Sequence, residues 1–309
     1  MKKLVSIILL IALIFSFSAC QNTLNISSDN SKLQVMTAMF AEYDFARQIA
    51  GEYAQVQMLL PPGADMHSYE PTPKDIINIK NCDIFIYGGG ESDSWLDDVL
   101  DSLGENITTV KMMDACELLH EDEHAEESHG HDEEEYDEHV WTSPKNAIKI
   151  VDAITEALCL ADSKNADAYS KNKKEYINKL NNLDKNFKFV IDNAKRHELI
   201  FADRFPLLYF AEEYGLEYFS AFPGCSHSNE ASAGKVRELI DHVRVDDIPV
   251  VFKIELSSDS LAQTVASETG AIVLEFNSCH GITRSQLENG ETYLSLMEQN
   301  LENLKIALN

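Results

Sequence analysis

The sequence is poor in basic residues. Its 309 residues include 25 Lys and Arg against 52 Asp and Glu, which gives a formal net charge of −27 at pH 7. Recognition of nucleic acid requires clustered Lys and Arg, so the composition argues against a partner bound through phosphate. The hydrophobic content of 44% is typical of a globular protein, and the length predicts about two domains.

Catalytic motifs are also absent. The His-Glu-x-x-His spacing occurs at residues 120–124, but in an acidic segment that is not predicted to form a helix, so the sequence has no His-Glu-x-x-His zinc helix, and it has no Gly-x-Ser-x-Gly nucleophile elbow. Gly88, Gly89 and Gly90 follow a predicted strand, but they lack the spacing and the following Lys of a phosphate-binding loop. A catalytic metal site would also need a positioned general base and a substrate pocket. We therefore expect a binding protein rather than an enzyme.

No apolar run is long enough to span a membrane, which takes about 20 residues. The run from Leu4 to Phe17 follows two lysines and precedes Ser-Ala-Cys20, which is the pattern of a secretory signal. Residues 1–20 resemble a bacterial lipoprotein signal peptide, which implies lipidation of Cys20; a plain signal cleaved nearby is the alternative. Residues 21–32 are polar and are interpreted as a flexible tether. The mature chain is thus expected outside the cytoplasm, anchored to the outer face of the cell membrane or in the periplasm.

Cysteines are few, and none occurs in the Cys-x-x-Cys spacing of a zinc ribbon. Five remain after Cys20, so at most two disulfides can form in a compartment that allows them. Cys225 and Cys279 both follow predicted strands, and we expect these two to pair if any do. Cys159 lies in an apolar stretch and is expected to be a buried free thiol.

Short β-rich runs alternate with helical patterns in both halves, which favours an α/β fold with parallel sheets. The expected architecture is two Rossmann-like lobes, residues 33–162 and 198–309, joined by one long rigid connecting helix at residues 163–197. That segment contains no Gly or Pro, and its apolar residues recur at helical spacing. Thr72-Pro73 and Ser143-Pro144 mark two helix starts. The strands are expected at residues 33–40, 56–60, 83–88, 107–112, 199–202, 216–222, 250–255 and 271–276, with a last helix at 292–308.

The acidic residues are concentrated in one segment. Residues 117–139 hold 12 acids and five of the ten histidines, without Lys or Arg. Imidazole is a ligand suited to zinc, copper and nickel, and flanking carboxylates raise the local concentration of divalent cations. The segment has almost nothing to bury and cannot fold alone. We interpret residues 117–138 as a loop that captures metal with low affinity, and a solvated acidic loop is the alternative. The loop ligands would be His120, His124, His129 and His131.

A selective site needs ordered ligands, and three other histidines are placed for one. His67 lies in a proline-rich loop, and His139 lies in a short motif just before a predicted helix start. His280 follows the last predicted strand of the second lobe. In parallel α/β sheets, ligands bind beyond the carboxyl ends of the strands. All three positions satisfy that rule.

These motifs resemble those of the zinc and manganese receptors of bacterial ABC importers, the metal-binding cluster of extracytoplasmic solute-binding proteins. The resemblance covers nearly the whole mature chain and is most specific in residues 67–75 (HSYEPTPKD), 137–141 (DEHVW) and 293–301 (YLSLMEQNL). It implies that His67 and His139 bind the metal. The acidic loop before His139 is similar to the insertion of zinc-specific members.

Two departures from the family's pattern concern the remaining ligands. The family places a His or Glu within residues 201–206, but this chain has Ala202 at the expected position. The fourth family ligand, usually an acid, falls close to His280. Three histidines and water would satisfy the four-coordinate preference of zinc. The other side chains that could complete the set are Asp203, Glu255, Cys225 and His227.

The sequence is therefore interpreted as an extracytoplasmic receptor that captures Zn²⁺ with high affinity and delivers it to an ABC importer. Imidazole-rich sites without a carboxylate favour Zn²⁺, whereas Mn²⁺ prefers oxygen ligands. The resemblance implies a permease and, through it, a cytoplasmic ATPase as partners, and we expect a monomer held at the membrane by its lipid anchor. The alternatives are a manganese or iron receptor of the same class and a surface zinc-buffering or adhesion lipoprotein. His197 and His242 lie in charged stretches and are expected to face solvent.

Overall fold

The computed structural model describes residues 32–103, 107–120, 136–222 and 231–309. Contacts divide the chain into two compact units, residues 1–31 and residues 32–309, and the second contains all the elements named below. The predicted signal peptide with Cys20, and all but the last residue of the predicted tether, lie outside the described residues and stay predictions. No helix in the described ranges is both long and apolar enough to cross a membrane.

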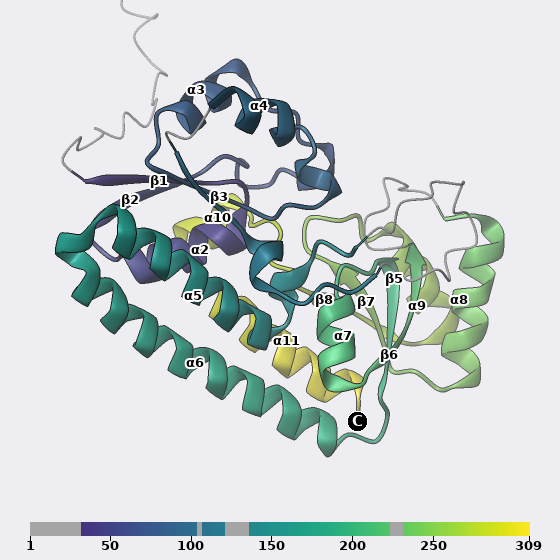
Figure 1. The fold of residues 1–309 in the computed structure, drawn as a ribbon. Helices are drawn as coiled ribbons and strands as arrows, with labels where there is room; N and C mark the ends of the chain where they lie inside the picture. The colour runs from purple at the N-terminus through teal and green to yellow at the C-terminus, as the bar shows by residue number, and fades with distance from the viewer. Residues whose placement is uncertain (1–31, 104–106, 121–135, 223–230) are drawn as a thin grey trace, which may run out of the picture. The chain divides into compact units, whose positions relative to one another are not determined.

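The first lobe is built on a four-stranded parallel sheet. Its strands, in sheet order, are β2 (Ala54–Met58), β1 (Leu33–Thr37), β3 (Ile84–Tyr87) and β4 (Thr108–Lys111). The helices that cover it are α2 (Phe40–Ala50), α3 (Pro73–Lys80), α4 (Leu96–Leu103) and α5 (Pro144–Ala161). Figure 1 shows α3 and α4 on one side of the sheet and α2 and α5 on the other. The two predicted helix starts are confirmed, because Thr72 and Ser143 cap α3 and α5 with their side chains.

The second lobe repeats this plan with another four-stranded parallel sheet. Its strands, in sheet order, are β6 (Glu217–Phe222), β5 (Glu198–Arg204), β7 (Val250–Ile254) and β8 (Ile272–Phe276). Its helices are α7 (Leu208–Tyr214), α8 (Ala233–Val245), α9 (Ser260–Thr269) and α11 (Tyr293–Ala307), whereas α10 (Arg284–Glu288) follows β8 and lies beside α2 of the first lobe (Figure 1). Side chains alternate along β5, so Phe201 joins the main core while Ile200 and Ala202 join a second core with α8 and α9.

One long helix, α6 (Ala166–Asp192), connects the lobes and runs past α5 and α11 (Figure 1). Its 27 residues span about 40 Å at 1.5 Å per residue. Its buried face is a stripe at helical spacing that consists of Tyr169, Tyr176, Leu180, Leu183, Phe187 and Ile191. The stripe confirms the predicted amphipathic helix, although the helix is shorter than residues 163–197. A 3-10 turn at Ser163–Asn165 precedes it, and it ends at Asp192 before a link to β5.

The predicted fold class, two parallel α/β lobes joined by a long helix, is confirmed, and all eight predicted strands are present. The largest shift of a single strand end is at β1, which ends at Thr37 rather than at residue 40 because Met39 already caps α2. The other 3-10 turns follow strands or precede α5: η1 (Met66–Ser68), η2 (Glu91–Asp93), η4 (Met112–Ala115) and η5 (Val140–Thr142).

Candidate metal site

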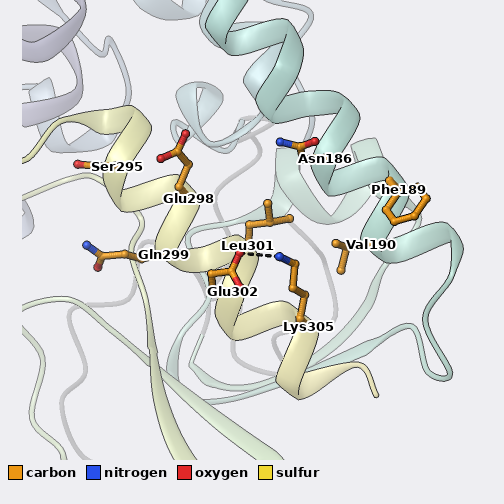
Figure 2. A pocket seen from close by; sticks show the side chains of 9 residues that line it. All are labelled: Asn186, Phe189, Val190, Ser295, Glu298, Gln299, Leu301, Glu302 and Lys305. Carbon is orange, nitrogen blue, oxygen red and sulfur yellow. Dashed lines mark hydrogen bonds and ion pairs between the residues drawn. The ribbon is translucent and has the colours of Figure 1, made fainter.

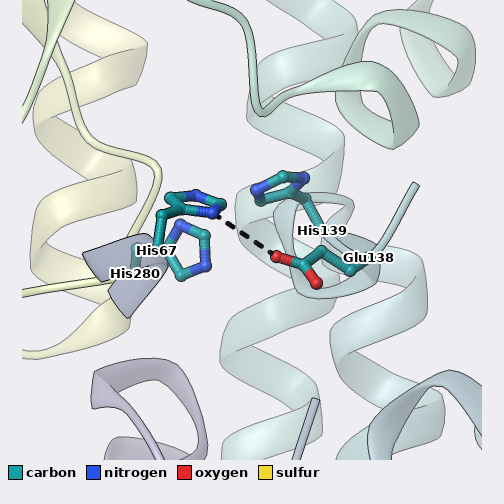
Figure 3. Close-up of side chains that lie close together, drawn as sticks. All are labelled: His67, Glu138, His139 and His280. Atoms are coloured by element: carbon teal, nitrogen blue, oxygen red, sulfur yellow. Dashed lines mark ion pairs between the residues drawn. The ribbon is translucent and has the colours of Figure 1, made fainter. Parts of the chain in front are cut away.

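Four metal-ligating side chains meet between the lobes: His67, Glu138, His139 and His280 (Figure 3). One ligand atom from each lies within 4.8 Å of those of the others. The imidazole centroids are 4.8 Å apart for His139 and His280, 4.9 Å for His67 and His280, and 5.9 Å for His67 and His139. Three imidazoles and a carboxylate at this spacing form a donor set that suits zinc.

His67 is fixed by contacts from both lobes. It lies in η1, which follows β2, and its backbone N–H donates to the Asp65 carboxylate at 3.0 Å. Arg204, at the end of β5 in the second lobe, forms an ion pair with the same Asp65 at 2.9 Å. The Nδ1 atom of His67 lies 3.0 Å from Ser92 Oγ. Because a hydrogen bond at one ring nitrogen orients the other toward a metal, Nε2 of His67 would be the nitrogen that coordinates an ion here.

His139 is completely buried and is oriented by Asp137. One oxygen of the Asp137 carboxylate lies 2.8 Å from the backbone nitrogen and 3.1 Å from Nδ1 of His139. This carboxylate–histidine pair would direct Nε2 toward a bound metal and raise the basicity of the ring. The backbone carbonyl of Asp137 accepts a hydrogen bond from the Tyr209 hydroxyl of the second lobe at 2.8 Å. The His139 segment is therefore anchored from both lobes.

Glu138 is the member of the cluster that sequence reasoning missed. Its carboxylate accepts hydrogen bonds from the backbone N–H of Ser92, at 3.0 Å, and from the Ser92 hydroxyl. The room for it comes from Gly90, where a Cβ would lie 2.2 Å from Glu138 atoms. The sequence did contain a signal, since Glu138 precedes His139 and a run of glycines follows β3, but nothing in it showed that these segments meet.

His280 is held by a carboxylate below its loop. Glu255, which is buried and directly follows β7, accepts hydrogen bonds from Ser278 N, Ser278 Oγ and His280 N at 2.6, 2.7 and 3.0 Å. Between those residues Cys279 has φ of 61°, a left-handed conformation that is rare for a residue with a side chain. Trp141 of the first lobe donates its ring N–H to the Ser278 carbonyl at 2.8 Å. The turn that carries His280 is thus specified by contacts from both lobes.

The electrostatics of the site favour the neutral imidazoles of His67 and His280. Burial, followed by the nearby His139, lowers the pKa of His67 to about 4. Burial, followed by His139 and His67, lowers the pKa of His280 well below its usual range. A metal binds the neutral form of imidazole, so these side chains need not release protons near pH 7 before they coordinate.

The other side chains predicted as possible ligands do not join the cluster or lie outside the described residues. Asp203 does not join the cluster, because its carboxylate accepts hydrogen bonds from Ile254 N, at 3.1 Å, and from the Ser257 hydroxyl. Glu255 holds the His280 turn and likewise stays outside the cluster. Ala202 packs in the second core of the lobe, where a ligand would be directed away from the site. Cys225 and His227 lie outside the described residues.

The predicted loop ligands are mostly beyond what the structure describes. His124, His129 and His131 lie outside the described residues, whereas His120 forms an isolated antiparallel bridge with Tyr136. Cys279 is a free thiol and is completely buried, and its predicted disulfide partner Cys225 lies outside the described residues. The predicted disulfide therefore gains no support. Cys159 is free, as expected, but only partly buried.

Two hollows differ in what they offer a ligand. A groove of about 610 Å³ lies between α6 and α11 (Figure 2), and no histidine or cysteine is among the described residues that line it. A pocket of about 210 Å³ opens beside the cluster. Its lining consists of Met66, His67, Tyr69, Glu91, Ser92, Ser94 and Trp95. Of the two, only this pocket gives solvent a path to a candidate ligand.

The fold and the cluster together define a two-lobed α/β protein with a candidate metal site between its lobes. The family model described as ZnuA, zinc-uptake complex component A, periplasmic, matches residues 35–307, and the chain belongs to this family. The family is one of transport components rather than of enzymes.

Relatives with assigned names agree with this membership. The high-affinity zinc uptake system protein ZnuA of Bacillus subtilis is 33% identical over 318 residues, which cover 99% of this chain and 98% of that protein. The zinc-binding lipoprotein AdcA of Streptococcus pneumoniae is 32% identical over 310 residues, which cover 99% of this chain but 61% of that protein. The chain thus spans about three-fifths of this longer relative. The crystal structure of the Zn(II)-bound ZnuA-like domain of that AdcA matches with a TM-score of 0.76 at 31% identity, over 90% of this chain and 99% of that one.

Proposed function

We propose that this protein captures Zn²⁺ outside the cytoplasm and delivers it to an ABC importer. The observation that carries the proposal is the cluster of His67, Glu138, His139 and His280, whose members come from both lobes. A ligand set divided between lobes lets a small movement enclose or release the ion. The names of the relatives, a zinc uptake protein and a zinc-binding lipoprotein, support the same role.

The ligand set that we propose is the three histidines with Glu138 as the fourth ligand. Tetrahedral zinc takes nitrogen and carboxylate ligands in this number, whereas manganese prefers a larger share of oxygen. Ser92 supports the assignment, because ligating carboxylates are usually held by further hydrogen bonds. In this set His280 and Glu138 complete the coordination, because Ala202 occupies the position where the family has a His or Glu ligand. A manganese or iron receptor of the same class remains the alternative.

The partners and the location follow from the family. We infer delivery to a membrane permease that is driven by a cytoplasmic ATPase, from a monomer anchored to the outer face of the membrane through Cys20. The acidic loop, residues 117–138, would collect Zn²⁺ weakly and pass it to the ordered site. A buffering or adhesion lipoprotein is less well supported, because neither role needs ordered ligands from two lobes.

A calorimetric titration tests the proposal. Zn²⁺ is added to the metal-free protein, to a His67→Ala variant and to a variant that lacks residues 121–135, a deletion that keeps the His120–Tyr136 bridge. We expect one tight site that survives the deletion and is lost in His67→Ala, while the weaker sites that residues 121–135 contribute disappear with the deletion. If all Zn²⁺ binding leaves with residues 121–135, the cluster between the lobes is not a zinc site.

A further inference from the structure

A second set of metal-ligating side chains lies in the second lobe. Glu198 begins β5, while His242 and Asp246 lie at i and i+4 near the end of α8. One ligand atom of each lies within 4.8 Å of those of the others. Nε2 of His242 is 2.7 Å from Glu198 Oε1 and 3.4 Å from Asp246 Oδ2. Both carboxylates therefore face the same ring nitrogen.

We propose that Glu198, His242 and Asp246 form a second, exchangeable site for a borderline divalent cation such as Zn²⁺. In a tetrahedral zinc site with bonds of 2.0–2.1 Å, neighbouring ligand atoms are about 3.3 Å apart. The distances from His242 Nε2 to Glu198 and to Asp246, 2.7 and 3.4 Å, lie on either side of that value. A small outward movement of Glu198 would therefore let an ion replace the proton that His242 Nε2 shares with the carboxylates. Water would occupy the fourth position.

The surroundings of the set favour a cation. Both carboxylates are partly exposed, and neither forms an ion pair with Lys or Arg within the described residues. The His242 ring packs on Phe219, with centroids 4.7 Å apart and an interplanar angle of 32°, which limits its rotation. The His242 side chain is 26% exposed, so an ion can enter from solvent and leave again. The sequence predicted a solvent-facing His242, whereas its ring is only partly exposed because it packs on Phe219 and contacts Glu198.

This site is separate from the cluster between the lobes. Glu198 is the first residue of β5 and Arg204 is the last, and Arg204 contacts Asp65 beside His67. Seven residues of strand extend about 20 Å, so the two sites lie toward opposite ends of one strand. The inference does not depend on the proposed function, because it uses none of the same ligands.

The test is an NMR titration of the full chain with ¹⁵N-labelled histidine, starting from the metal-free protein. A His242→Gln variant assigns the ring signals of His242, and Zn²⁺ and Mg²⁺ are added separately. We expect Zn²⁺, but not Mg²⁺, to shift the Nε2 signal of His242, because imidazole coordinates zinc whereas magnesium prefers oxygen and retains its water. The shift should persist in a His67→Ala variant, which separates this site from the first one.

Carboxylate variants decide between coordination and a simple ion pair. Glu198→Gln and Asp246→Asn should each raise the Zn²⁺ midpoint of the His242 shift at least about tenfold, the scale on which even outer-shell changes weaken metal sites. The matched control is Asp241→Asn, an exposed carboxylate on the same helix, which should leave the midpoint unchanged. The proposal is overturned if His242 is unmoved at millimolar Zn²⁺, or if both carboxylate variants titrate like the unchanged chain.

Discussion

The buried carboxylate of Glu255 should control how tightly the protein holds Zn²⁺ although it does not belong to the cluster. It accepts three hydrogen bonds from the turn that carries His280. In Glu255→Gln the amide oxygen keeps part of this network, but the amide NH₂ would face a backbone or hydroxyl donor. Hydrogen bonds to a charged group contribute about 1.5–3 kcal/mol each, and an unsatisfied buried donor costs about 1–3 kcal/mol. The free energy of unfolding of the variant should therefore be about 2–4 kcal/mol lower than that of the unchanged protein.

The effect on zinc follows from the position of His280. Mutation of a residue that orients a metal ligand usually lowers metal affinity about 10–100-fold. We therefore expect a Zn²⁺ titration of Glu255→Gln to show a loss of affinity of that size. Stability is measured by urea unfolding of the metal-free protein. The control is Glu275→Gln, which removes a surface carboxylate that pairs with Lys253; exposed pairs contribute at most about 1 kcal/mol. Unchanged zinc affinity in a folded Glu255→Gln protein would refute the positioning role.

Three further changes have expected outcomes. Burial raises the pKa of Asp93 from 3.8 to about 6, so between these values the folded chain holds a proton that the unfolded chain has released, and stability falls as the pH rises. Asp93→Asn should therefore raise the free energy of unfolding at pH 8 by about 3 kcal/mol and change it little at pH 4; equal effects at both pH values in urea unfolding would contradict this. Arg204→Met removes an ion pair whose partner Asp65 is 42% exposed, so it should cost at most about 1 kcal/mol of stability. Because Asp65 also holds the backbone of His67, the variant should release Zn²⁺ faster in stopped-flow chelation, and an unchanged release rate would count against the link to His67. Glu138→Gln should weaken Zn²⁺ binding at least about tenfold and Mn²⁺ binding more, because it removes the carboxylate of the cluster; calorimetry that finds both metals unaffected would exclude Glu138 as a ligand.

Local patterns were enough to predict most of the fold. The β-rich runs, the proline-marked helix starts and the long stripe of α6 depend on neighbours in sequence, and the structure confirms each of them. The positions of His67, His139 and His280 beyond strand ends also follow from a local rule, since parallel strands direct their carboxyl ends to one edge. These three residues do meet in the structure.

Contacts between distant segments could not be predicted in the same way. Glu138 joins the cluster because Gly90 and Ser92, more than 40 residues earlier, leave room for it and hold it. Asp203 and Glu255 had the right chemistry for ligands, but backbone and hydroxyl donors of the second lobe already engage them. Which of several acids faces a site is decided by packing across the fold, and no periodicity in the sequence reports it.

The measurement that tests the central claim most directly is a crystal structure of the protein with one equivalent of Zn²⁺, with anomalous diffraction data collected at the zinc edge. We predict a single strong peak between the lobes, with nitrogens of His67, His139 and His280 at about 2.0–2.1 Å and a Glu138 oxygen at about 2.0–2.2 Å. A peak found only elsewhere in the chain, with these three histidines unliganded, would contradict the account.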